Sequence, residues 1–220
     1  MTTRLRSAID GFYQFVSQPL YLWSRPVLVL LVVPLAFSVL QPLWHIRMEA
    51  PQYPEGLTID VYSYKLVGGH DGSDIHEINI LNHYIGMKKL DRGALAELDW
   101  LPFGFGALGL LLLRVAALGN VRSLLDFAVM TGYFGGFSMA RFVTKMYSFG
   151  HDLAHDAPVK VKPFTPVLWG TKEIANFTTH GYPGTGTWLV AGFTAGVFLI
   201  TLIHLVEGRR RARRAAVTEV

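Results

Sequence analysis

The stretch GTWLVAGFTAGVFLITLIHLV, residues 186–206, contains no Asp, Glu, Lys or Arg. A helix needs about 20 apolar residues to cross the hydrocarbon layer of a bilayer, which is about 30 Å thick. Three other stretches approach this length and composition. The sequence therefore predicts an all-α integral membrane protein with four transmembrane helices, at residues 26–46, 100–118, 124–143 and 186–207.

The composition of the whole chain agrees with a membrane protein. Of its 220 residues, 51% are hydrophobic and only 16% are charged, and the mean hydropathy is +0.32. A soluble globular protein usually exposes more charge than this. The net charge of +4 arises largely from an arginine cluster directly after the last apolar stretch, so we expect membrane orientation rather than nucleic-acid binding to explain it.

The positions of the basic residues predict which segments face the cytoplasm. Arginines are concentrated before the first apolar stretch, between the second and third, and after the fourth, and the positive-inside rule makes these regions cytoplasmic. Both termini are then cytoplasmic, in the inner membrane of a bacterium. We expect a cytoplasmic interfacial segment (1–25), a cytoplasmic turn (119–123), an Arg-rich cytoplasmic tail (208–220) and two extracytoplasmic loops (47–99 and 144–185).

The two predicted outer loops contain short secondary structure. Alternation of Leu57, Ile59 and Val61 with polar residues predicts a short strand. Apolar residues at helical spacing predict a short helix that begins at Ile75, after a pair resembling a capping box (Asp74 and Glu77). In the second loop, residues 159–169 are expected to be extended and residues 172–179 to form a surface helix.

Histidine and methionine at helical spacing suggest a metal site in the first loop. His76, His83 and Met87 are seven and four residues apart, which places them within about 40° of one helix face. His151 and His155 in the second loop would also share a helix face. Imidazole and thioether ligands suit copper, although a solvent-facing polar stripe would have the same pattern.

The distribution of such residues points to the same side of the membrane. Most of the histidines fall at or beyond the predicted outer interface, as do three methionines (His45, His70, His76, His83, His151, His155 and His180; Met48, Met87 and Met146). If the chain crosses the membrane four times, both loops meet at one surface. The predicted metal site therefore comprises His76, His83, Met87, His151 and His155.

Several kinds of chemistry are disfavoured by the sequence. The absence of cysteine excludes haem c attachment, a thiolate metal site and an iron–sulfur cluster. A b-type haem needs two axial ligands at matching depth, but His204 lies near the cytoplasmic end of the last predicted span and His45 lies at the opposite face. No nucleophile elbow, phosphate loop or paired-carboxylate centre is found. We therefore expect a protein that is not an enzyme and holds no haem by itself.

Three segments resemble a known family: residues 48–57 (MEAPQYPEGL), 77–87 (EINILNHYIGM) and 149–153 (FGHDL). They are similar to small bacterial multi-pass membrane proteins associated with copper-dependent respiratory enzymes, in particular accessory proteins of nitrous oxide reductase. The resemblance covers roughly residues 25 to 205 and implies that His83, Met87 and His151 are candidates for copper binding. Where that family has an acidic residue and a proline, this chain has Ala154 and His155.

Two functions follow as hypotheses. The first is a non-enzymatic accessory membrane protein that binds or passes copper at the periplasmic face and supports a copper-dependent respiratory enzyme. The alternative is a structural or assembly subunit of a membrane respiratory complex with no metal of its own. Expected partners are membrane lipids, a membrane or periplasmic protein and, through the GxxxG pair of Gly192 and Gly196, a second copy of the chain.

Overall fold

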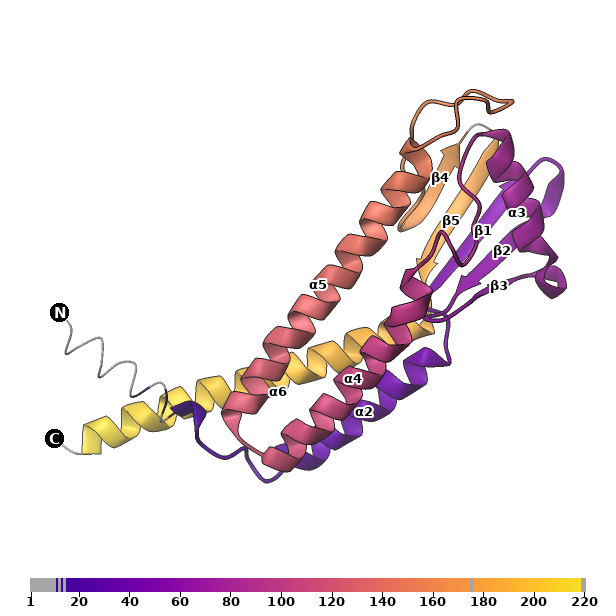
Figure 1. Cartoon of the computed structure of the whole chain (residues 1–220). Coiled ribbons are helices and arrows are strands. Elements are labelled where there is room, and N and C mark those ends of the chain that lie inside the picture. Colours follow the sequence, from indigo (N-terminus) through magenta and orange to yellow (C-terminus); the bar gives the residue numbers. More distant parts are fainter. Residues whose placement is uncertain (1–10, 12, 14, 175, 219–220) are drawn as a thin grey trace, which may run out of the picture. The chain divides into compact units, whose positions relative to one another are not determined.

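The structure is a computed structural model that describes residues 11, 13, 15–174 and 176–218. Its elements, labelled as in Figure 1, are α2 (Ser24–Val39), β1 (Trp44–Ala50), β2 (Tyr53–Val61), β3 (Leu66–Gly68), η1 (His70–Gly72), α3 (Ser73–Tyr84), α4 (Glu97–Leu118), α5 (Val121–His151), β4 (Gly170–Ile174), β5 (Phe177–Pro183) and α6 (Thr185–Thr218). Residues 1–10 of the predicted interfacial segment and the side chains beyond residue 208 lie outside this description.

The chain divides into two compact units, and each long helix contributes residues to both. Unit 1 comprises Met1–Leu35, Ala107–Phe134 and Ala191–Val220, and unit 2 comprises Ala36–Gly106 and Gly135–Val190. Unit 1 is helical, whereas unit 2 contains all five strands.

The prediction of an all-α protein with four transmembrane helices is wrong. Unit 2 contains a five-stranded antiparallel sheet, and among the described residues only α4 and α6 are long and apolar enough to cross a membrane. Helix α2 has 16 residues and therefore spans only about 24 Å. Helix α5 is longer, but Arg122, Asp126, Arg141 and Lys145 and its several glycines lower its hydropathy.

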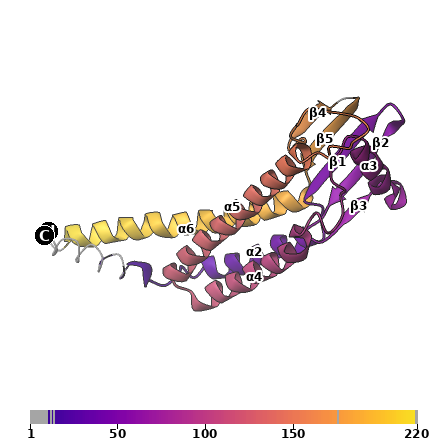
Figure 2. The same ribbon diagram turned by 45° about the horizontal axis from the view of Figure 1, so that its top comes forward.

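The sheet of unit 2 has the order β3-β2-β1-β5-β4, and its strands lie side by side in Figures 1 and 2. The central strand, β1, pairs with β2 on one side and with β5 on the other. Its sequence WHIRMEA alternates, so Ile46 and Met48 face one side of the sheet and His45 and Arg47 the other. Residues that were assigned to the end of a membrane span and to two separate loops therefore form one sheet.

One face of this sheet is covered by α3. Leu57 and Ile59 of β2 pack against Ile78 and Leu81 of α3, and all four side chains are buried. The helix predicted from Ile75 is confirmed, and it begins at Ser73. The predicted capping box is absent from it, because Asp74 is buried and bonds to β2 instead. The surface helix predicted at residues 172–179 is also wrong, since β4 and β5 form a hairpin there.

Unit 1 is held by close contacts between helices. Leu28, Leu112, Leu124 and Val197 are fully buried. A Cβ atom added to Gly196 would lie 2.7 Å from Cδ2 of Leu31, whereas one added to Gly192 would contact nothing within 4 Å. Gly196 thus packs against α2 of the same chain. Self-association through the Gly192/Gly196 pair stays a prediction.

His204 joins α6 to the segment before α2 within unit 1. It is only 3% exposed. Its Nδ1 lies 2.8 Å from the carbonyl oxygen of Ile200, and its Nε2 accepts a hydrogen bond from the Tyr21 backbone N–H at 3.2 Å. Both ring nitrogens are therefore engaged in protein contacts, which gives this buried imidazole a structural role.

Candidate functional site

The predicted stripe of metal ligands on α3 is interrupted. His76 and His83 are exposed on the helix, but α3 ends at Tyr84, and Gly86 has a φ of +78°. Met87 therefore lies beyond the helix, where its backbone N–H donates to the carbonyl oxygen of Asn82 at 2.8 Å. The assumption of a continuous helix fails at Gly86, because glycine readily adopts this left-handed conformation.

The two histidines of the second loop do not share a helix face either. Helix α5 ends at His151, so His155 lies outside it. The ring of His151 stacks on Tyr147 with a centroid distance of 3.7 Å, and its Nδ1 lies 3.0 Å from the Tyr147 carbonyl oxygen. His155 is exposed and its carbonyl oxygen accepts a hydrogen bond from Lys160.

The segments that carry these residues nevertheless meet. The backbone N–H of Ala154 donates to the carbonyl oxygen of Gly86 at 2.8 Å, and that of Val159 donates to Tyr84 at 2.9 Å. Lys88 forms an ion pair with Asp152, with an Nζ to Oδ2 distance of 2.9 Å. The segment between α3 and α4 is thus joined to the segment after α5.

Gly86 is required for this junction. An added Cβ atom would lie 2.9 Å from the backbone nitrogen of Ala154 and 2.9 Å from Cβ of Ala157. Part of the element Asn-His-Tyr-Ile-Gly-Met at residues 82–87, which carries the resemblance, therefore has a structural explanation. Gly86 allows the end of α3 to pack against the segment after α5.

The five predicted ligands do not form a metal centre of the expected kind. Among the described residues, no group of three or more His, Asp or Glu side chains is placed to hold a metal ion. His76, His83 and His155 are exposed, and His151 is occupied by Tyr147. The structure joins the two predicted segments but does not bring their imidazoles into one cluster.

Met87 is the exception, because it lines a cavity inside unit 2. This cavity has a volume of about 80 Å³, and Met48 of β1 and Met146 of α5 line it as well. Its other walls are mainly aliphatic and aromatic, and Asn82 and Thr179 also face it. The sequence placed all three methionines on one side of the membrane, but it gave no signal that they face a common space.

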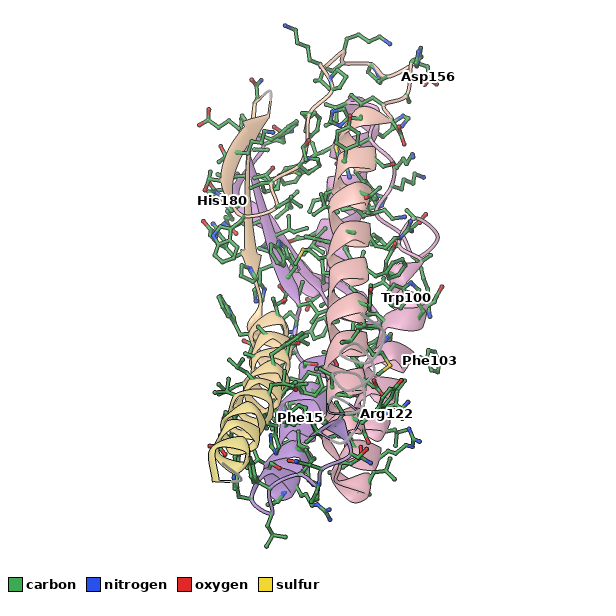
Figure 3. All side chains as sticks on the ribbon, turned by 90° about the vertical axis from the view of Figure 1, so that its left-hand side faces the viewer. Phe15, Trp100, Phe103, Arg122, Asp156 and His180 are labelled. Atoms are coloured by element: carbon green, nitrogen blue, oxygen red, sulfur yellow. The ribbon has the colours of Figure 1, made fainter. Side chains whose placement is uncertain are left out.

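A second feature that was not predicted is the polar face of the sheet. His45, Arg47, Asp60, His180 and other residues line an open groove of about 700 Å³. His45 pairs with Asp60 at 2.6 Å between Nδ1 and Oδ1, and Nδ1 of His180 lies 2.8 Å from Oγ1 of Thr171. Figure 3 shows where His180 lies on β5. Opposite charges alternate on this face, so it carries no strong charge of one sign.

A buried carboxylate anchors the edge of unit 2 nearest η1. Asp74 is 1% exposed. It accepts a hydrogen bond from the Thr58 backbone N–H at 2.7 Å and pairs with Nδ1 of His70 at 2.8 Å. His70 and Asp71 both adopt left-handed backbone conformations, so this contact holds a turn that few residues other than glycine favour.

The His70 imidazole should titrate at a higher pH than an unperturbed histidine does. Its hydrogen bond to the Asp74 carboxylate raises the pKa of His70 above the ordinary value of about 6.5. A group whose pKa is raised by folding stabilises the native state fully below the unfolded pKa, and this contribution is lost as the pH rises through the folded pKa. We expect NMR titration of the His70 imidazole to give a midpoint above about 6.5. An Asp74→Asn variant should lower it, and an unchanged midpoint would exclude Asp74 as the cause.

Comparison with known protein families, curated proteins and solved structures finds no match to this chain. The resemblance to accessory proteins of nitrous oxide reductase therefore stays a prediction.

Proposed function

We propose that this chain is a non-enzymatic accessory protein of the bacterial inner membrane that handles copper at the periplasmic face, in support of a copper-dependent respiratory enzyme. The observation that carries the proposal is the junction between residues 84–86 and 154–159. It joins the segment of His83 and Met87 to that of His151 and His155. These are the soft and borderline ligands that copper prefers in a chain without cysteine.

Membrane attachment is supported by the side chains that α4 and α6 expose. Phe103 and Leu110 of α4 are 79% and 71% exposed, and Phe103 points away from its helix in Figure 3. Leu199 and Leu202 of α6 are also exposed. Large apolar side chains on apolar helices of this length fit a lipid environment better than water.

Copper content tests this proposal. Detergent-purified protein is incubated with excess Cu(I) under reducing, anaerobic conditions, freed of unbound metal and analysed for copper per chain. We expect close to one copper ion per chain. The double variant His83→Ala/Met87→Ala should lose it, whereas the control His180→Ala/Met139→Ala removes an imidazole and a thioether elsewhere and should keep it. Wild-type protein that holds no copper contradicts the proposal.

The alternative, an assembly subunit without metal, is favoured by the polar face of the sheet. In this case, the groove lined by His45, Arg47 and His180 would contact another subunit. This alternative expects metal-free wild-type protein and loss of complex assembly when Arg47 is replaced by Glu. The copper measurement therefore discriminates between the two functions.

A further inference from the structure

Three methionines from distant parts of the sequence converge on the cavity in unit 2. Met48 comes from the central strand, Met87 from the segment after α3 and Met146 from the last turns of α5. None of the three is fully exposed. The sheet, the end of α3 and α5 thus each supply one thioether to the same space.

The cavity is unusual for a methionine-rich core. Methionine is flexible and commonly fills irregular gaps between other side chains. Here a space of about 80 Å³ stays open beside three methionine side chains. A space of this size is large enough for a bound ion or a small molecule.

Asn82 adds a buried polar group to the wall of the cavity. It is 2% exposed, and it lines the cavity together with the three methionines. An amide oxygen that faces a cation stabilises the positive charge, and oxygen ligands of this kind supplement thioether sulfur without adding a charge of their own.

The ligand chemistry selects among metal ions. Thioether sulfur is a soft, neutral ligand, which favours Cu(I) over Mg²⁺, Ca²⁺ and other hard cations. A monovalent ion also carries less charge into an apolar cavity than a divalent one, so its desolvation costs less. The absence of cysteine leaves methionine as the sole soft ligand in the chain.

We propose that Met48, Met87 and Met146 bind one Cu(I) ion in this cavity through their thioether sulfur atoms, with the Asn82 amide facing the ion. The inference rests on the proposed copper function and moves its site from the exposed histidines to the interior of unit 2. No electron transfer is involved, because copper binds and leaves as Cu(I).

The test is an anaerobic titration of Cu(I) against a coloured Cu(I) chelator, with the full chain in detergent. Each of Met48→Leu, Met87→Leu and Met146→Leu keeps an apolar side chain of similar volume. Each should weaken binding at least about ten-fold, because loss of a ligand should cost no less than loss of an outer-shell partner. The triple variant should not bind. The controls Met130→Leu and Met139→Leu alter exposed methionines of α5 and should bind as wild type does.

The possible results of this titration distinguish failure of the methionine site from failure of the proposed copper function. A triple variant that binds Cu(I) as tightly as wild type overturns the methionine site, and the copper function survives if a His83→Ala/His151→Ala variant loses the metal instead. Wild-type protein that binds no Cu(I) overturns both. If the triple variant fails to fold, as judged by circular dichroism, the three single variants decide the question.

Discussion

A Gly150→Ala variant is expected to unfold unit 2 more readily than any other single Gly→Ala change in α5. A Cβ atom at this position would overlap with the backbone carbonyl oxygen of Phe164, and the Phe164 N–H donates to the Gly150 carbonyl oxygen at 3.0 Å. Neither backbone can move without breaking this contact. Overpacking of this kind costs about 3 kcal/mol of unfolding free energy, which lowers the thermal midpoint by roughly 6–12 °C.

The same helix offers matched controls for this prediction. A Cβ atom at Gly135 or Gly136 would have no neighbour within 4 Å. Alanine at these sites should leave the midpoint unchanged or raise it, because alanine favours a helix by up to about 1 kcal/mol over glycine. Thermal unfolding in detergent measures all three variants. A Gly150→Ala protein as stable as the two controls would show that α5 does not pack against the segment of Phe164.

An Asp74→Ala variant is the second change with a large expected effect. It removes the carboxylate that pairs with the Thr58 backbone N–H and with His70. A buried donor without a partner costs about 1–3 kcal/mol. Because His70 is exposed and can turn to water, the cost comes from the Thr58 N–H, and we expect a loss of about 1–3 kcal/mol.

Urea unfolding followed by circular dichroism measures this loss. An Asp156→Ala variant is the control, because Asp156 is exposed in the segment after α5 (Figure 3) and its replacement should change stability by less than about 0.5 kcal/mol. Asp74→Asn should fall between the two, since its amide oxygen can still accept from Thr58. Equal stability of the Asp74→Ala and Asp156→Ala variants would contradict the role assigned to Asp74.

The sequence allowed the prediction of those elements whose signals are local. Helix α3 was predicted from the spacing of Ile75, Ile78 and Leu81, and the composition of residues 186–206 predicted an apolar helix that the structure contains as part of α6. These patterns lie within one element. They need no knowledge of a partner elsewhere in the chain.

The sheet was missed because its strands depend on distant partners. His45 pairs with Asp60 and Tyr182, and no local pattern links these positions. The strand β1 also follows directly on an apolar stretch, so the composition alone predicts that residues 44–46 end a membrane span. Only pairing with β2 and β5 makes Trp44–Ala50 a strand.

The prediction of the candidate site was incomplete for the same reason: its residues come from distant parts of the chain. Met87 was identified from its spacing to His83, although Gly86 ends the helix that this argument required. Met48 of β1 and Met146 of α5 line one cavity with Met87 only in the folded chain, so no local pattern predicts that the three share a space. No local pattern marks Asn82, because its burial and its place in the cavity wall arise only in the folded chain.

X-ray absorption spectroscopy of the copper-loaded protein tests the central claim most directly. Because the chain has no cysteine and six methionines, any sulfur bound to copper must be a thioether. Copper bound in unit 2 as proposed should show sulfur neighbours at about 2.3 Å, the length typical of metal–sulfur bonds, and these should disappear in the Met48→Leu/Met87→Leu/Met146→Leu variant. A spectrum with nitrogen and oxygen neighbours alone, or a protein that retains no copper, would contradict it.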